Sequence, residues 1–166
     1  MVTVDIKRAS RHLLAPAWLV SRVFDAEQLN AIEQVIRETE LLQGGEIRVA
    51  VEGNLTPAEL WRGVTPRDRA VQVFAQLGVW DTDANNGVLI YVSWADRDVE
   101  IVADRGFNGL VSAAEWSAVC ANMERLFAQR QPREAMIEGI RAVGKLIARH
   151  FPAVDRNELP DRPVML

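Results

Sequence analysis

A polar stretch rich in carboxylates and amides runs directly into an unbroken apolar segment at residues 80–92. Its carboxylate and amide side chains are Asp81, Asp83, Asn85 and Asn86. Such oxygens, without a histidine or a thiol beside them, are the ligands that Ca²⁺ and Mg²⁺ prefer. We therefore interpret this stretch as a candidate divalent-cation site, with Asp81 and Asp83 as its charged ligands.

Three strands must position this site. Residues 87–93 are apolar on both alternating faces and rich in β-branched types, which predicts a strand buried on both sides. Residues 46–52 alternate between apolar and charged types and predict a second strand. Residues 98–103 follow a tight connection and predict an antiparallel third strand. A helix separates the first two strands, so these should be parallel through a right-handed crossover.

This topology gathers residues that are far apart in the sequence at one end of the sheet. Glu46, Asp104 and Arg105 should join loop 80–86 there. The predicted metal ligands are Asp81, Asp83, Asn86, Asp104 and Glu46. The helix that ends at Gly78 directs the negative end of its dipole toward the same edge, which favours a cation by about 0.3–1 kcal/mol. Asp104 and Arg105 are the candidate catalytic residues, because an arginine there could bind a phosphate.

Each of these residues also has a purely structural interpretation. Loops rich in Asp and Asn are often turns whose side chains bond their own backbone, and Asn86 could brace such a turn before Gly87. Glu46 could be a solvated strand end, and Arg105 could simply pair with Asp104. The sequence leaves these alternatives open.

The chain divides into an N-terminal arm at residues 1–24, an α/β domain at residues 25–152 and an irregular C-terminal strap at residues 153–166. Five helix starts are predicted from capping residues and prolines that precede apolar residues at helical spacing. They lie at Asp25, Thr56, Thr65, Ser112 and Gln131. We expect the arm to pack its apolar residues on the domain. Pro16 disfavours a continuous membrane-binding surface in the arm.

Composition limits the function classes. The 166 residues are 49% apolar and 25% charged, as in one ordinary globular domain. The net charge of −4 argues against nucleic acid as a partner. Cys120, the single cysteine, lies on the apolar face of a predicted helix and is interpreted as a core thiol.

Two further expectations concern catalysis and location. His12 and His150 are the only histidines and lie outside the proposed site, so a Ser-His-Asp or Cys-His site is not expected there. Neither a secretory signal nor a membrane-spanning stretch is recognised, and we expect a cytoplasmic protein.

Three segments together resemble the TPM-domain family: NGVLIYV at 86–92, DRDVEI at 96–101 and DRG at 104–106. The resemblance covers roughly residues 26–151. It implies a three-layer α/β/α sandwich with a small mixed β-sheet, divalent-cation binding and phosphatase activity, since the family includes a thylakoid-lumen acid phosphatase implicated in photosystem II repair. The chain departs from many members at 103–106, where it lacks their glycine-rich segment. It also shows neither their signal peptide nor their membrane anchor.

Two functions follow as expectations. The first is a module that binds Ca²⁺ or Mg²⁺ and so orders a loop for a protein partner or for assembly. The alternative is a metal-dependent, acid phosphatase-like hydrolase of phosphomonoesters. In that case an ion held by Asp81, Asp83 and Asp104 would activate water, and Arg105 would neutralise the phosphate of a small molecule. We favour the binding module, because the cluster contains no evident general base.

Overall fold

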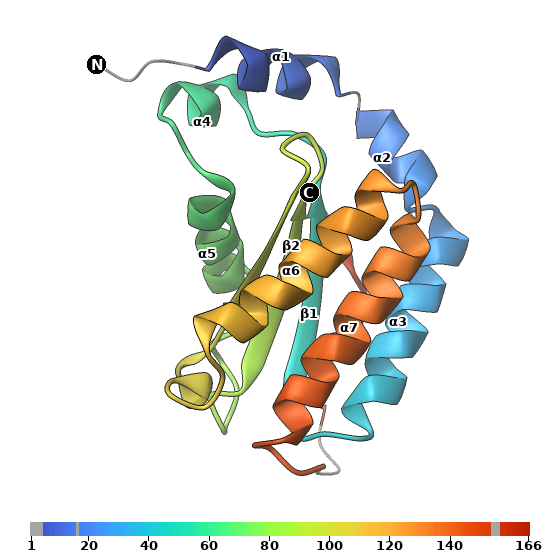
Figure 1. Ribbon diagram of the computed structural model, residues 1–166, viewed down its shortest axis with the longest axis vertical. Helices are drawn as coiled ribbons and strands as arrows, with labels where there is room; N and C mark the ends of the chain where they lie inside the picture. Colours follow the sequence, from blue (N-terminus) through green and yellow to red (C-terminus); the bar gives the residue numbers. More distant parts are fainter. Residues whose placement is uncertain (1–4, 16, 154–156) are drawn as a thin grey trace.

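A four-stranded mixed sheet forms the centre of the computed structural model, which describes residues 5–15, 17–153 and 157–166 (Figure 1). The strands are β1 (Glu46–Glu52), β2 (Gly87–Ser93), β3 (Asp98–Ala103) and β4 (Val164–Met165), in the order β3-β2-β1-β4. β1 is parallel to β2 and β4, whereas β2 and β3 are antiparallel. The three longer strands and their directions agree with the sequence prediction. β4 does not, because it lies in the strap that the sequence predicts to be irregular.

Helices cover both faces of the sheet. They are α1 (Ile6–Leu14), α2 (Ala17–Val23), α3 (Ala26–Glu40), α4 (Pro57–Trp61), α5 (Pro66–Gln76), α6 (Ala113–Ala128), α7 (Pro132–Ala148) and the short 3₁₀ helix η1 (Arg105–Phe107). Helices α3, α6 and α7 lie on one face, and α5 lies on the other (Figure 1). This is the predicted α/β/α sandwich.

Four of the five predicted helix starts are confirmed by side-chain caps, whereas Gln131 precedes α7 without a side-chain cap hydrogen bond. Thr56, Thr65 and Ser112 each form a capping box with the acidic residue three positions later. Asp25 caps α3 by accepting a hydrogen bond from the backbone amide of Gln28, 2.9 Å away. These signals are local, so the sequence alone was enough to place them.

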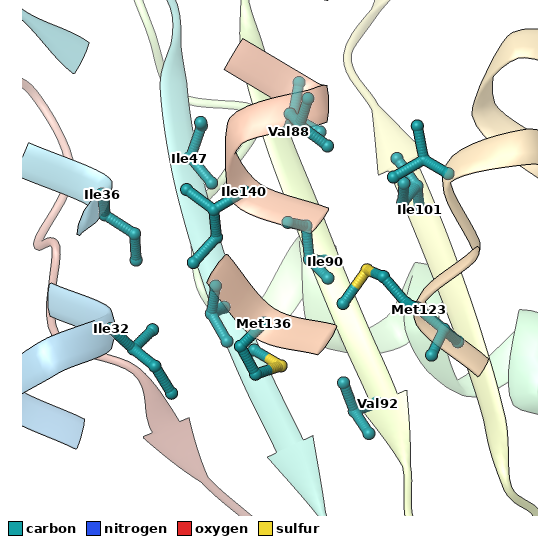
Figure 2. Close-up of a cluster of buried hydrophobic side chains, with 14 of the residues drawn as sticks. Ile32, Ile36, Ile47, Val88, Ile90, Val92, Ile101, Met123, Met136 and Ile140 are labelled. Carbon is teal, nitrogen blue, oxygen red and sulfur yellow. The ribbon is translucent and has the colours of Figure 1, made fainter. Parts of the chain in front are cut away.

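The larger core lies between the sheet and helices α3, α6 and α7 (Figure 2). Ile47 and Ile90 of the sheet are buried together with Met123 of α6 and with Met136 and Ile140 of α7 (Figure 2). Burying such side chains contributes roughly 1.5–3 kcal/mol each. This layer therefore supplies much of the stability that holds the sheet edges in place.

Two glycines allow α7 to approach its neighbours closely. A Cβ atom on Gly139 would lie 2.2 Å from Sδ of Met123, and one on Gly144 would lie 2.1 Å from Cγ2 of Thr39. These two glycines therefore permit close packing of α7 against α6 and α3.

All seven residues of β1 are buried, although Glu46, Arg48 and Glu52 carry charge. Segment 157–166 and α5 cover the face of the sheet to which these side chains belong. Arg48 Nη1 donates to the carbonyls of Pro160 and Arg162. Glu52 accepts from Tyr91 Oη and forms an ion pair with Arg69 of α5, in which Nη2 and Oε1 are 2.8 Å apart. The solvated strand end considered for Glu46 is therefore wrong.

The N-terminal arm is helical on both sides of residue 16, and the predicted interruption at Pro16 itself lies outside the described residues. Val20 and Phe24 join the main core, as expected of the arm. Five large apolar side chains of the described part of the arm instead remain exposed, namely Ile6, Leu13, Leu14, Trp18 and Leu19. Helix α1 contacts the domain through its polar face, because Arg8 and His12 reach Asp96 in the β2–β3 turn.

Among the described residues, we find no helix whose length and apolar character would let it cross a membrane.

Candidate cation site at the sheet edge

The predicted edge forms through backbone hydrogen bonds between its segments. β1 begins opposite β2, with Glu46 paired to Gly87 in the register. The amide of Glu46 donates to the carbonyl of Asn86 (3.2 Å), and that of Asp104 donates to the carbonyl of Gly87 (2.9 Å). The amide of Gly106 donates to the carbonyl of Asn85 (2.9 Å). The topological argument therefore placed Glu46, loop 80–86 and residues 104–106 correctly beside one another.

Loop 80–86 is organised by its own short-range bonds. The amide of Asn85 donates to the carbonyl of Thr82 (3.2 Å), and the amide of Asn86 donates to Oγ1 of Thr82 (3.1 Å). Asn85 has φ of 52°, a left-handed conformation that asparagine tolerates. Thr82 is buried and central to this turn, but the sequence analysis missed it. The loop is therefore a turn, as the structural interpretation expects, but Thr82 supplies the side-chain bond that this interpretation assigned to Asp and Asn.

Among the proposed carboxylate ligands, Glu46 is the most buried, but both of its oxygens accept hydrogen bonds. Asp104 is the next most buried. The residue is only 9% exposed, and its Oδ1 accepts a hydrogen bond from the backbone amide of Arg105 (2.7 Å), which caps η1. Its other oxygen, Oδ2, is buried without a hydrogen-bond partner among the described residues.

In the Asn86 side chain, too, only one of the two polar atoms has a hydrogen-bond partner among the described residues. Its Nδ2 donates to the carbonyl of Gly44, which braces the turn as one alternative predicted, and its Oδ1 is buried without a hydrogen-bond partner among the residues the structure describes. Each of these two residues therefore carries one oxygen that still lacks a donor or an ion.

Glu46 has a different role. Its two carboxylate oxygens accept the backbone amides of Glu158 and Leu159, each at 3.0 Å. Burial raises the pKa of Glu46, and the two amide donors oppose that rise. Because both oxygens are engaged, Glu46 anchors the C-terminal segment in the structure.

Asp81 and Asp83 are exposed on the loop. The backbone amide of Asp83 donates to Oε2 of Glu158 (3.0 Å), so the C-terminal segment also contacts this loop. Within residues 5–15, 17–153 and 157–166, no three side chains of His, Cys, Asp or Glu are grouped to hold a metal ion. A cation at this edge would therefore need amide and backbone carbonyl oxygens and water beside Asp104, all of which Ca²⁺ accepts.

Arg105 is exposed beside loop 80–86. Its Nε donates to Oδ1 of Asn85 (2.7 Å), and its bond to Asp104 is made by the backbone amide alone. The alternative of a side-chain pair between Arg105 and Asp104 is not what the structure shows. Asn85, which the sequence analysis did not assign as a ligand, positions the guanidinium instead.

Other titratable groups lie elsewhere. His12 is buried beside Asp96 at the opposite end of the sheet, where β2 ends. Burial raises the pKa of the Cys120 thiol to about 12, in agreement with the prediction of a core thiol.

The fold of this chain is that of a known protein family. The model of the TPM domain matches residues 20–146, and the chain therefore belongs to the TPM-domain family. This membership confirms the resemblance deduced from the strand segments. No functionally curated protein matches the chain.

Solved structures agree with this membership. The chain is 33% identical to the BA42 protein of the psychrophilic bacterium Bizionia argentinensis, over 86% of this chain and 94% of that one, with a TM-score of 0.75. Two bacterial N-terminal domains share the fold at lower identity. The N-terminal domain of a protein from P. gingivalis is 18% identical (TM-score 0.59; 80% of this chain, 82% of that one). That of the cg2496 protein of Corynebacterium glutamicum is 13% identical (TM-score 0.54; 81% and 80%).

Proposed function

We propose that this TPM domain binds a divalent cation, Ca²⁺ or Mg²⁺, at the edge where β1 and β2 begin, and that the ion orders loop 80–86 for a protein partner. The observation that supports the proposal is Oδ2 of Asp104, which is buried without a hydrogen-bond partner among the described residues. An unpartnered buried carboxylate oxygen costs free energy, and a hard cation would remove that cost.

The residues around Asp104 fit such an ion. Oδ1 of Asn86 is a second buried oxygen without a donor, and Asp81 and Asp83 lie on the adjoining loop. Ca²⁺ takes six to eight oxygens, including backbone carbonyls and water, so it does not require three carboxylates. Trp80 is 54% exposed at the start of the same loop and is the apolar contact that an ordered loop would offer a partner.

The test is a melting experiment on the full chain with and without CaCl₂ or MgCl₂. Binding at 100 times Kd should stabilise the folded state by about 2.7 kcal/mol, which raises the melting temperature by several degrees. The variant Asp104→Asn keeps an oxygen for the amide of Arg105 but removes the charge. It should fold and lose the shift.

A matched control is Glu134→Gln, an exposed acidic residue on α7, which should retain the wild-type shift. The proposal is contradicted if neither ion changes the melting temperature of the wild-type protein. It is equally contradicted if Asp104→Asn responds as strongly as the wild type does.

A second candidate function is hydrolysis of phosphomonoesters, and Arg105 is the observation that favours it. Asn85 holds the guanidinium at Nε, and the two outer nitrogens make no hydrogen bond or ion pair with the described residues. Such a group is suited to neutralising a phosphate. We rank hydrolysis second, because a metal-activated water needs a firmly held ion and no three ligating side chains are grouped in the described part of the chain.

Hydrolysis is tested with p-nitrophenyl phosphate, with each ion present, against a blank of metal ion alone. Turnover above the blank that disappears in both Asp104→Asn and Arg105→Gln would establish the hydrolase. A protein that shows the melting shift but no turnover is the binding module alone.

A further inference from the structure

A pocket of about 760 Å³ lies at the end of the sheet opposite Asp104. It is lined by the end of β2, the β2–β3 turn, the second half of α6 and Arg130. Figure 1 shows the β2–β3 turn and the α6–α7 connection at the same upper end of the molecule. Ligands of open α/β sheets bind beyond the carboxyl ends of the strands, and small-molecule pockets commonly enclose about 300–1,000 Å³.

Two arginines of this pocket adopt a backbone conformation that favours glycine. Arg97 has φ of 57° and Arg130 has φ of 60°. At other left-handed positions the described chain places Gly63, Gly78 and Gly109, and the remaining one is the tolerant Asn85. The two arginines are thus the costly exceptions, and both line one pocket.

The turns themselves do not require arginine. Arg130 lies directly after Gln129, the C-cap of α6. Its amide donates to the carbonyl of Phe127 and the next amide donates to the carbonyl of Leu126, each at 3.0 Å. This is the position of a helix end that glycine usually occupies. Arg97 lies in a hairpin turn of the kind that favours Gly, Asn or Asp. Neither guanidinium has a hydrogen bond or an ion pair with any residue that the structure describes, so the fold gains nothing evident from either side chain.

The pocket also contains an acidic group that lacks a partner. Oδ1 of Asp98 is buried and accepts no hydrogen bond from the described residues. Burial raises the pKa of Asp98 to about 6, with Glu100 and Glu124 adding to the rise. Glu124, which also lines the pocket, is engaged by the amide of Val99 (3.1 Å). Asp98 is therefore the acceptor that a donor on a ligand would satisfy.

The apolar wall completes the site. Trp94 and Phe127 contact each other edge to face, with ring centroids 6.2 Å apart, and both line the pocket beside Val92 and Val99. This wall suits the apolar body of a small ligand.

We propose that this pocket binds a small zwitterion of the amino-acid class. Its carboxylate lies against Arg97 and Arg130, its ammonium group donates to Asp98, and its apolar side chain packs on Trp94 and Phe127. This site is separate from the cation edge and does not depend on the proposed function.

The experiment is a titration of the full chain with L-phenylalanine, followed by two-dimensional NMR and calorimetry. The comparison compounds are L-phenylalaninamide, which lacks the carboxylate, and N-acetyl-L-phenylalanine, which lacks the ammonium group. Each should bind about 10-fold more weakly or worse, because each loses a charge-assisted hydrogen bond. The perturbed resonances should include the indole N–H of Trp94.

The decisive variants are Arg97→Gly and Arg130→Gly. Each should melt at or above the wild-type temperature, because glycine relieves the left-handed backbone, and each should bind L-phenylalanine about 10-fold more weakly. Asp98→Asn should lose the preference for the free ammonium group over the N-acetyl compound. Arg133→Gln, an exposed change on α7 outside the pocket, should bind as the wild type does.

Two outcomes overturn the proposal. The first is an absence of pocket perturbations by L-phenylalanine at millimolar concentration. The second is a lower melting temperature in both glycine variants with unchanged binding, which would show that the arginines serve the fold.

Discussion

His12 accepts the backbone amide of Leu55 at Nδ1, over 2.9 Å and across 43 positions of sequence. This bond leaves the ring proton on Nε2, which lies 3.1 Å from Oδ1 of Asp96. Arg8 binds the same carboxylate at both oxygens, at 2.8 and 2.9 Å. Helix α1 is therefore fastened to the domain by polar contacts on its inner face, with its large apolar side chains outside.

The first prediction concerns Asp96. Although burial alone would raise its pKa, the hydrogen bonds from Arg8 and the closeness of His12 outweigh it and hold the pKa at about 2. Asp96→Asn should destabilise the protein by about 2 kcal/mol, because it leaves a partly buried guanidinium without its counter-charge. It should also expose α1 to trypsin at Lys7, Arg8 and Arg11. Proteolysis and chemical unfolding measure both effects.

The loss of stability in acid provides a second measurement of the ion pair between Asp96 and Arg8. Because the folded pKa of Asp96 is depressed, its stabilisation is present above the ordinary carboxyl pKa of about 4 and is lost as pH falls through about 2. Glu138→Gln on the exposed face of α7 is the control and should leave the trypsin pattern unchanged. An α1 that stays protected in Asp96→Asn would show that other contacts hold it.

The second prediction concerns Glu40 at the end of α3. Its Oε1 accepts the amide of Ile47 (2.8 Å), and burial, with smaller contributions from Glu46 and Asp161, raises its pKa to about 8. Between about pH 4.5 and pH 8 the folded protein keeps a proton that the unfolded chain has released. The contribution of Glu40 to stability therefore falls as pH rises through this window.

Glu40→Gln keeps an oxygen for Ile47 and removes the charge. The variant should gain on the order of 2 kcal/mol relative to the wild type between pH 5 and pH 9, measured by urea unfolding at each pH. Glu38→Gln on the exposed side of the same helix should show no such trend. Parallel pH curves for wild type and Glu40→Gln would refute the assignment.

The third prediction tests the contact between α7 and α3. Gly144→Ala should destabilise the protein by about 1–3 kcal/mol, because the new methyl group would meet Cγ2 of Thr39 at 2.1 Å. Thr39→Ser deletes that methyl group and should restore most of the loss in the double variant. Thermal unfolding of the wild type, the two single variants and the double variant forms a complete cycle. A loss that the serine does not relieve would place the strain elsewhere.

Local signals explain what could be predicted from the sequence. Capping residues specified the starts of α4, α5 and α6, and the apolar run 88–92 specified the central strand. Chain topology then brought Asp104 beside loop 80–86. These features depend on a few neighbouring residues or on the handedness of one crossover.

Long-range partners explain what could not be predicted. Glu46 is engaged by amides 112 and 113 positions later, and Arg8 by a carboxylate 88 positions later. An alternating strand has the same sequence pattern whether its charged face is exposed to solvent or covered by another segment of the chain. The proposed ligands Asp81 and Asp83 illustrate a related difficulty, because sequence places a loop at an edge but does not aim its side chains.

The C-terminal segment, residues 157–166, determines how this domain should be prepared. The family match stops at residue 146, yet the peptide amides and carbonyls of residues 158–162 satisfy Glu46 and Arg48, and Val164–Met165 completes the sheet beside β1. A fragment trimmed to the matched region would leave two ionised groups on an uncovered sheet and an open strand edge ready to recruit other chains. A fragment prepared for study should therefore include residues 157–166.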